Sequence, residues 1–298
     1  MTVARIAVLI LQLSVILVVF TLGLESTFKD ALSLFRRPAL LFRSLLSMNV
    51  VMPVFAAFVA ATFHLKPAVE IALVFLAVSP VPPIVPRQQL KLGGNSNYVH
   101  GLLVSAALAS IVLVPIMVEI LGKVFRQDIH VTPLTVAKIV ALTILLPIAA
   151  GMWVHRRAPK FAQKAAPRLS RVALVLLLVL SVVVLVMLLP GVAIMVGNGT
   201  ILAIAAFVVV GAAVGHWLGG PVPGERTTLA LATASRHPGL ALAIASVNYP
   251  GQRRSVAAVI VLYFLVKAIV LLPYTRWRRR QLRAYDPQQE MGVKQRVA

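Results

Sequence analysis

Apolar residues occur along this chain in long runs that are separated by short polar stretches. Nine of the runs approach the length of about 20 residues that an α-helix needs to cross a bilayer. Their approximate ranges are Arg5–Leu24, Ala39–Phe63, Pro67–Leu92, Tyr98–Leu121, Pro133–Val154, Val172–Pro190, Gly199–Leu218, Thr228–Val247 and Ser255–Thr275. The pattern predicts an all-α polytopic membrane protein with nine transmembrane helices.

The first run differs from a cleavable signal peptide. It is longer than the roughly 7–15 residues of a signal core, and no small-residue cleavage site precedes Glu25. We therefore expect it to be retained as the first span. Because no stretch between the runs is long enough for a soluble domain, residues 1–275 are expected to form one transmembrane domain. Residues 276–298 would follow it as a basic cytoplasmic tail.

The composition supports the membrane class. Hydrophobic residues make up 60% of the chain and charged residues 12%, with a mean hydropathy of +0.94, whereas about a quarter of the residues in soluble domains are charged. A net charge of +21 would suggest nucleic acid as the partner of a soluble protein. Here the charge lies mostly in short loops between apolar runs, where it faces lipid headgroups instead. Without cysteine, the chain has no thiolate nucleophile or zinc–thiolate site.

Basic residues gather in alternate loops, and this bias predicts the orientation. One side carries Lys29, Arg36, Arg37, Arg43, Arg156, Arg157, Lys160, Lys164, Arg168, Arg171, Arg226, Arg276, Arg278, Arg279, Arg280, Arg283, Lys294 and Arg296. The other side carries only Arg5, Lys66, Lys123, Arg126, Lys138, Arg253 and Arg254. Because basic loops stay in the cytoplasm, we expect a bacterial inner-membrane protein with its N-terminus outside and its C-terminus inside. An odd number of spans, such as nine, is required.

Two of the predicted spans contain residues that interrupt a helix. The third contains Pro80, Pro82, Pro83 and Pro86, and the eighth contains Pro238 and Gly239 in its middle. Proline removes a backbone donor and clashes with the preceding turn, and glycine permits unusual backbone angles. Non-helical backbone at membrane depth is tolerated only where protein buries it or where it lines a water-filled cavity. Both spans could otherwise be structural helices with proline kinks.

The two interrupted spans occupy matching positions, each next to last in a group of four spans. The groups cover residues of about 1–124 and 170–275, and a span at 131–155 connects them. The interrupted spans cross in opposite directions, so the groups are expected to be inverted repeats. Interrupted spans in corresponding places of inverted halves indicate the central site of a secondary transporter.

Several motifs, in order along essentially the whole chain, resemble one transporter family. They are Thr21-Leu22-Gly23-Leu24 with Phe28 and Asp30, Met52-Pro53, Glu70-Ile71-Ala72 through Pro82, Leu146-Pro147 with Gly151 and His155, and Arg226-Thr227-Thr228 through Gly239-Leu240-Ala241. At these residues the sequence resembles the bile acid:sodium symporter family, within the wider bile/arsenite transporter group. The resemblance implies a core and a panel domain, with two broken helices that cross in the core beside the substrate.

The sequence departs from this family at the residues that would hold sodium. The resemblance implies small polar residues in the third span, where Arg87 and Gln88 stand here. It also implies a glutamate and a glutamine–asparagine pair in the eighth span, where Ala232 and Arg236-His237 stand. Sodium needs oxygen ligands, usually with a carboxylate, and the apolar runs contain no central Asp or Glu. We therefore do not expect coupling through the family's usual sodium site.

Two arginines near the breaks suggest an anionic substrate. An unpartnered arginine at membrane depth costs at least about 2.5–3.5 kcal/mol, and neither Arg87 nor Arg236 has an obvious carboxylate partner in the sequence. Their guanidinium groups could hydrogen-bond broken-helix carbonyls, or they could replace two sodium ions and attract an anion together with half-helix N-termini. The predicted substrate-binding residues are Arg87, Gln88, Gln89, Thr233, Ser235, Arg236 and His237. His237 could exchange a proton near neutral pH, or serve only as a hydrogen-bonding group at the break.

These patterns predict a secondary transporter that moves a small or amphipathic organic anion by alternating access. No metal or cofactor is expected, and an enzyme is disfavoured because the chain lacks carboxylate pairs, thiols and histidine clusters. Three alternatives stay open. They are sodium coupling through substituted ligands, a membrane receptor or regulatory protein that binds without transport, and a channel, which suits interrupted inverted repeats less well.

Overall fold

The computed structural model of the protein describes the backbone of residues 3–284 and the side chains of residues 9–282. Every regular element in this part is a helix, as the apolar runs predict. In chain order they are α1 (Val3–Leu24), α2 (Phe28–Ala31), η1 (Ser33–Arg36), α3 (Pro38–Leu46), η2 (Ser47–Val51), α4 (Met52–Thr62), α5 (Pro67–Val78), α6 (Val85–Lys91), α7 (Ser96–Phe125), α8 (Pro133–Val140), η3 (Ala141–Leu145), α9 (Leu146–Arg157), α10 (Pro159–Met195), α11 (Thr200–Leu218), α12 (Pro223–Thr233), α13 (Pro238–Asn248), η4 (Pro250–Gln252) and α14 (Arg253–Ala284). The segments η2 and η3 are π-helical, whereas η1 and η4 are 3-10 turns.

Six of the described helices are long and apolar enough to cross a membrane. They cover Pro38–Thr62, Ser96–Phe125, Pro133–Arg157, Pro159–Met195, Thr200–Leu218 and Pro250–Leu282, and shorter apolar helices cover Leu9–Leu24 and Pro67–Val78. The chain is therefore a membrane protein with multiple apolar helices. Nine crossings stay a prediction, because the third and eighth expected spans are each divided into two short helices.

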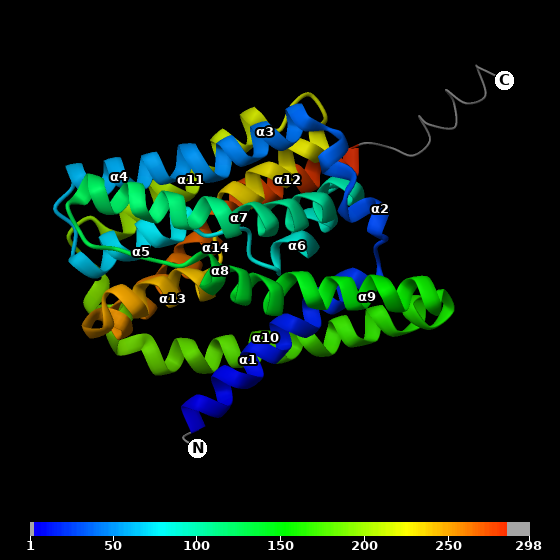
Figure 1. Ribbon diagram of the computed structural model, residues 1–298, viewed down its shortest axis with the longest axis horizontal. Coiled ribbons are helices and arrows are strands. Elements are labelled where there is room, and N and C mark those ends of the chain that lie inside the picture. The colour runs from blue at the N-terminus through cyan, green and yellow to red at the C-terminus, as the bar shows by residue number, and fades with distance from the viewer. Residues whose placement is uncertain (1–2, 285–298) are drawn as a thin grey trace.

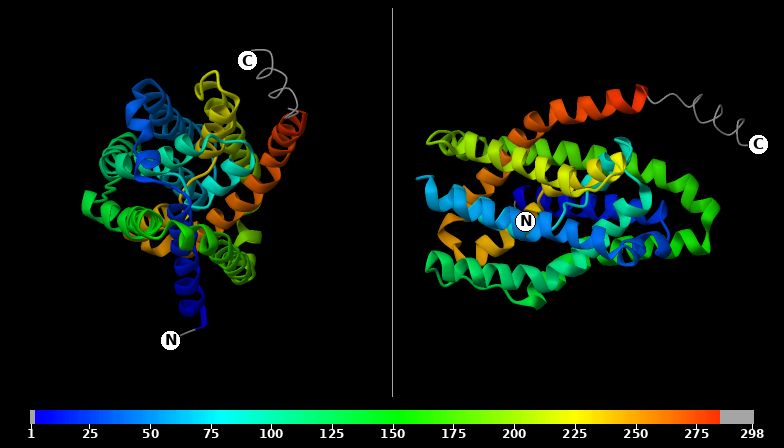
Figure 2. Two further views of the ribbon diagram at one scale, coloured as in Figure 1. Left: turned by 90° about the vertical axis from the view of Figure 1, so that its right-hand side faces the viewer. Right: turned by 90° about the horizontal axis from the view of Figure 1, so that it is seen from above.

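The helices form two groups. α1 packs chiefly against α9 and α10, and these three lie together on the lower side in Figure 1. The larger group contains α3 to α7 and α11 to α14, and α14 also packs against α10. Figure 2 shows α1 projecting from one side of the molecule while α14 runs along another. The inverted repeats, and the core-and-panel division that the family resemblance implies, stay predictions.

A row of glycines brings α11 close to α12. Gly211 and Gly215 lie four residues apart on α11, so they share one face of that helix, and Gly219 follows four residues later as its C-cap. A Cβ atom at Gly215 would lie 2.5 Å from the carbonyl oxygen of Leu229, and one at Gly211 would lie 3.0 Å from the carbonyl oxygen of Thr233. Small residues of this spacing let helix backbones approach closely in membranes. The close packing positions the last turn of α12, where the second interrupted span breaks.

Each interrupted span is divided into two helices, and the prolines and the glycine that were expected at the breaks lie either in a break or in the first turn of the helix after it. The first break covers residues 79–84, between α5 and α6, and includes Pro80, Pro82 and Pro83. The second covers residues 234–237, between α12 and α13. Pro86 lies in the first turn of α6, and Pro238 and Gly239 lie in the first turn of α13. Proline is tolerated there because the first amides of a helix have no intrahelical partner, so these residues restart the helices.

The expected cytoplasmic tail begins as a helix. α14 continues through Ala284, beyond the expected end of the last span at Thr275. Its final turns carry several arginines, and Nη2 of Arg278 donates to the carbonyl of Pro223 over 3.0 Å. The rest of the tail, with Lys294 and Arg296, lies outside the described residues.

Candidate functional site

The two breaks meet within the larger helix group. The backbone N–H of His237 donates to the carbonyl of Pro80 over 2.9 Å, so the second break contacts the first directly. We call residues 79–84 and 234–237 together the crossing. All of these residues except Ile84 are buried. Protein thus encloses the irregular backbone, as non-helical structure at membrane depth requires.

Arg236 places a guanidinium group inside the crossing. The residue is 0% exposed. Its Nη1 donates to the carbonyl of Ser79 over 3.2 Å, and its Nη2 donates to the carbonyl of Met48 over 2.9 Å. None of the ion pairs among the described side chains involves Arg236. Of the two roles that its sequence position allowed, the structure shows hydrogen bonding to carbonyls near a helix break.

Local backbone geometry supplies these carbonyl oxygens. Ser79 follows the last residue of α5, so its carbonyl lies at the C-terminal end of a half-helix. Met48 lies in the π-helical segment η2, where the regular α-helical hydrogen-bond pattern is interrupted. α12 ends at Thr233, shortly before Arg236. Because the C-terminal end of a helix carries partial negative charge, the ends of α5 and α12 both favour a cation here.

Tyr263 of α14 holds the second break in place. Its hydroxyl donates to the carbonyl of Ala234 over 2.7 Å and accepts the backbone N–H of Arg236 over 3.1 Å. Nearby, the hydroxyls of Thr233 and Ser47 lie 2.7 Å apart. These bonds satisfy polar groups that the broken helix leaves without helical partners.

His237 caps the restarted helix α13. Its Nδ1 accepts the backbone N–H of Leu240 over 3.2 Å. A neutral imidazole that accepts at Nδ1 carries its proton at Nε2, and Nε2 has no hydrogen-bond partner among the described residues. The structure thus shows the hydrogen-bonding role for His237. Protonation at Nδ1 would remove the cap.

Arg87 and Arg236 contact different elements. Arg87 lies on α6, where its Nη2 donates to Oγ1 of Thr21 and its Nη1 lies 3.7 Å from Oε2 of Glu25. Folding therefore gives Arg87 a carboxylate neighbour that was not obvious in the sequence, because it brings the end of α1 beside α6. This geometry gives Arg87 a role in joining α6 to α1.

The other predicted substrate-binding residues lie in two places. Gln88 is exposed. Gln89 is buried, and its Nε2 donates to the carbonyl of Thr228 over 2.7 Å, which ties α6 to α12. Thr233 and Ser235 lie beside Arg236, with both residues buried. The structure therefore gathers Thr233, Ser235, Arg236 and His237 near the crossing and places Gln88 and Gln89 on α6.

Lys267 is a second cation beside the crossing. It lies on α14, and its Nζ is 3.4 Å from Oγ of Ser235 in the second break. The same atom lies over the rings of Phe264 and Tyr263, at 4.6 Å and 5.7 Å from their centroids. No ion pair among the described side chains involves Lys267. The motifs did not point to this residue, although a lysine among apolar residues inside an expected span is itself a signal of function.

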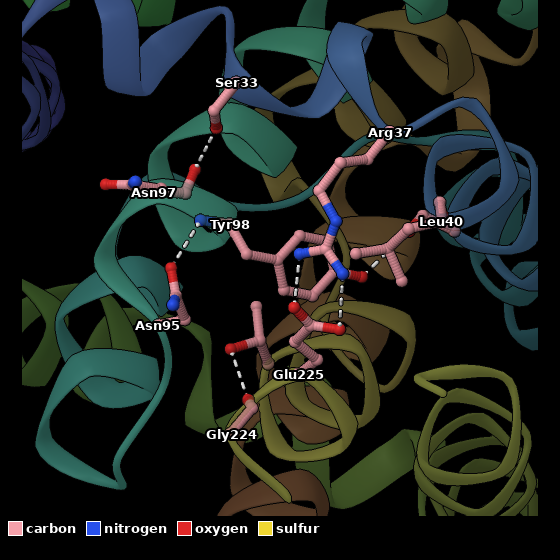
Figure 3. A network of polar contacts seen from close by, with 10 residues as sticks. Ser33, Arg37, Leu40, Asn95, Asn97, Tyr98, Gly224 and Glu225 are labelled. Carbon is pink, nitrogen blue, oxygen red and sulfur yellow. Dashed lines mark hydrogen bonds and ion pairs between the residues drawn. The ribbon is translucent and has the colours of Figure 1, made fainter. Parts of the chain in front are cut away.

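A separate polar network fixes the start of α12 (Figure 3). Glu225, in its first turn, forms a two-pronged ion pair with Arg37, in which Nη2 of Arg37 is 3.1 Å from Oε2 and Nη1 bonds Oε1. Glu225 is 3% exposed. The hydrogen bond to Glu225 raises the pKa of Arg37, which lies just before α3. α12 is therefore held by ionic contacts at its start, and the backbone after its end is held by Tyr263.

A comparison with protein families matches most of the chain. The model of the sodium bile acid symporter family matches residues 12–193. The chain belongs to this family. The match runs from α1 to α10 and includes the first break, whereas the second break and Arg236 lie beyond it. No curated protein matches the chain. Members of the sodium bile acid symporter family are transporters rather than enzymes, and this membrane protein is consistent with that class.

The crossing of this sodium bile acid symporter family member contains basic side chains. Ala232, where the family resemblance implies a glutamate, is 0% exposed and offers no side-chain oxygen. Among the described residues, no three His, Cys, Asp or Glu side chains come together as metal ligands would. The basic groups in or beside the second break, among the described residues, are therefore those of Arg236, His237 and Lys267.

Proposed function

We propose that this protein is a secondary transporter of a small or amphipathic organic anion, in which Arg236 takes the place of a mobile sodium ion. It would work by alternating access in a bacterial inner membrane, with its N-terminus outside and its C-terminus in the cytoplasm. The observation that carries this proposal is the buried guanidinium group of Arg236, which donates to the carbonyls of Ser79 and Met48.

The binding of those carbonyls by Arg236 suggests that transport is independent of sodium. Unwound carbonyls and half-helix C-terminal ends coordinate sodium ions in transporters with broken helices. In this chain a guanidinium group already binds one such oxygen, the carbonyl of Ser79, and a second carbonyl, that of Met48, in the π-helical segment η2. An arginine stays charged at every physiological pH and cannot leave the site. The negative ends of the half-helices are therefore neutralised permanently, without an ion from solution.

The charge balance supports an anionic substrate. Carbonyl groups compensate Arg236, but no carboxylate pairs with Lys267 among the described side chains. A cation at membrane depth is costly unless a partner stabilises it. An organic anion bound beside the crossing would provide that partner, whereas a cationic substrate would be repelled by both basic residues.

The test is uptake by the purified protein in liposomes. Labelled organic anions would be screened in sodium buffer and in potassium buffer, beginning with taurocholate, a bile-acid sulfonate. We expect at least one anion to enter at the same initial rate in both buffers. Arg236→Gln should abolish this uptake or make it dependent on sodium, because the carbonyls of Ser79 and Met48 lose their charged donor.

Two further arginine variants are compared with Arg236→Gln in the same uptake assay. Arg254→Gln, at an exposed position in the first turn of α14, should leave uptake and its indifference to sodium unchanged. Arg87→Ser should lower the rate without introducing sodium dependence, because Arg87 contacts α1. Wild-type uptake that requires sodium would contradict the proposal and show that other oxygens rebuild the cation site. Binding of an anion without uptake would indicate a receptor instead.

A further inference from the structure

The position of Lys267 makes its charge costly in the absence of a ligand. At about 1.5 Å per residue, Lys267 lies roughly 14 Å along α14 from Arg276, near the expected inner end of the last span. That depth falls within a hydrocarbon layer of about 30 Å. The only hydrogen bond to its Nζ among the described residues is the long contact of 3.4 Å with Ser235, so most of the hydrogen-bonding capacity of an ammonium group is unused.

Among the described side chains, no carboxylate forms an ion pair with Lys267. The second break contributes Arg236 and His237, and α14 contributes Tyr263, whose hydroxyl is bound to the backbone. The helices that pack against α14 are α5, α10, α11 and α13. On the parts that span the apolar layer, their ionisable residues are Glu70 in the first turn of α5, and His216 near the far end of α11, where it bonds Tyr274. α10 has none after Arg171, and α13 has none.

Lysine and arginine differ in what they can do here. A lysine in a partly buried, apolar environment can lose its proton, whereas an arginine cannot. The permanent charge of Arg236 opposes a second charge nearby, and the partial burial of Lys267 opposes it as well. A bound anion reverses this balance, since it attracts the ammonium form. Anion binding and proton binding at Lys267 must then strengthen one another by the same factor.

We propose that Lys267 is the proton-coupling residue of this transporter, taking up a proton when an organic anion binds at the crossing and releasing it when the anion leaves. The neutral amine accepts one proton from water on the side from which the anion enters. The resulting ammonium group pairs with the anion, so the pair crosses without net charge. On the other side the anion and the proton both leave, and the amine is neutral again. This inference rests on the proposed function.

Lys267 suits this role better than His237, which the sequence offered as the proton site. Nδ1 of His237 is occupied by the N–H of Leu240, so protonation would cost the N-terminal cap of α13. The ring also follows Arg236 directly in the chain. Protonation of Lys267 breaks no bond and adds a donor for the anion.

The experiment follows proton movement and anion uptake together. Proteoliposomes that contain a pH-sensitive dye would receive labelled taurocholate, or another permanently charged anion found in the uptake screen, in buffer free of sodium. Such an anion carries no proton itself. With wild-type protein, we expect uptake to acidify the interior, and a proton gradient directed inward to accelerate it. Liposomes without protein give the background.

Two substitutions separate coupling from binding. Lys267→Arg keeps a permanent charge, so it should still bind the anion while losing both the acidification and the response to the proton gradient. Lys267→Met should weaken anion binding roughly tenfold or more, because the charged partner is gone. Size-exclusion chromatography of each variant checks that it folds.

The possible results distinguish the two proposals. Acidification that persists in Lys267→Arg would overturn the role of Lys267, as would wild-type uptake without any acidification. In either case the protein would still be an anion transporter. If the wild-type protein binds no organic anion, both the proposed function and the coupling role fail.

Discussion

Arg236 shows how a permanent cation is kept at membrane depth without an acidic side chain. Its two terminal nitrogens bind main-chain carbonyls that belong to different segments, Ser79 beside α5 and Met48 in η2. Nε has no partner among the described residues, and an unsatisfied buried donor costs about 1–3 kcal/mol. The carbonyls and the half-helix ends offset this cost, so main-chain groups alone can hold a permanent cation here.

Removal of the Arg236 side chain should therefore create a site that responds to sodium. We expect Arg236→Ala to be less stable than the wild-type protein by about 2–4 kcal/mol, because it leaves a cavity and unpaired carbonyls. Sodium chloride should raise the Tm of this variant more than potassium chloride does, whereas the wild-type Tm should not distinguish the salts. Thermal unfolding in detergent measures both effects. Equal responses to the two salts in Arg236→Ala would argue against a cation site formed by these carbonyls.

Short helices and close contacts determine the position of the crossing at the scale of elements. Proline divides two long apolar segments into α5 with α6 and α12 with α13, and it also begins the second half of the eighth span. α11 presents Gly211 and Gly215 to the end of α12, so backbone packs directly on backbone. A helix with larger residues at these points would move α12 away, and Arg236 would lose its alignment with Ser79.

Gly215→Ala tests the contact between α11 and α12. The added Cβ would lie 2.5 Å from the carbonyl oxygen of Leu229, which backbone movement alone can relieve. Overpacking of this kind costs about 1–3 kcal/mol, so the Tm in detergent should fall and anion uptake should decrease. Gly251→Ala is the matched control, because nothing lies within 4 Å of its added Cβ. Equal stability of the two variants would mean that α11 and α12 separate without cost.

The whole molecule combines an apolar helical exterior with a buried crossing and with basic loops beside the ends of several helices. α1, α9 and α10 form one group, and the broken helices lie in the other (Figure 1). Loops rich in arginine and lysine occur beside the starts of α3 and α10 and at the end of α14. The positive-inside rule predicts that these ends lie in the cytoplasm, so we expect the start of α14 to face outward.

The absence of cysteine allows a direct test of this orientation. Single cysteines would replace Gly251, in the expected outer loop, and Lys160, in the expected inner loop, both of which are exposed positions. We expect a maleimide that cannot cross membranes to label Gly251→Cys in intact cells. It should label Lys160→Cys only after permeabilisation, and the wild-type protein in neither case. The reverse pattern would show that the protein is inserted the other way round.

Local patterns in the sequence predicted the helical membrane class and the two breaks, and the structure has both. The departure from the family's sodium residues stays a prediction. These features are local, because a run of apolar residues or a proline acts on its own segment. Pro86, Pro238 and Gly239 lie in the first turns of α6 and α13, next to the breaks, because proline can start a helix as well as end one.

Which charged residues meet at the crossing depends on tertiary contacts. Arg236 and Met48 are separated by 188 residues, and Arg87 and Thr21 by 66, so neither contact leaves a trace in local spacing. Arg87 and Arg236 were equivalent as sequence signals, yet one folds against Glu25 and the other against carbonyl oxygens. A lysine within an expected span is a local signal, but only the packing shows that its Nζ lies beside Ser235. The way in which the helices cross determines which groups surround each charge, and the crossing of the helices depends on the whole chain.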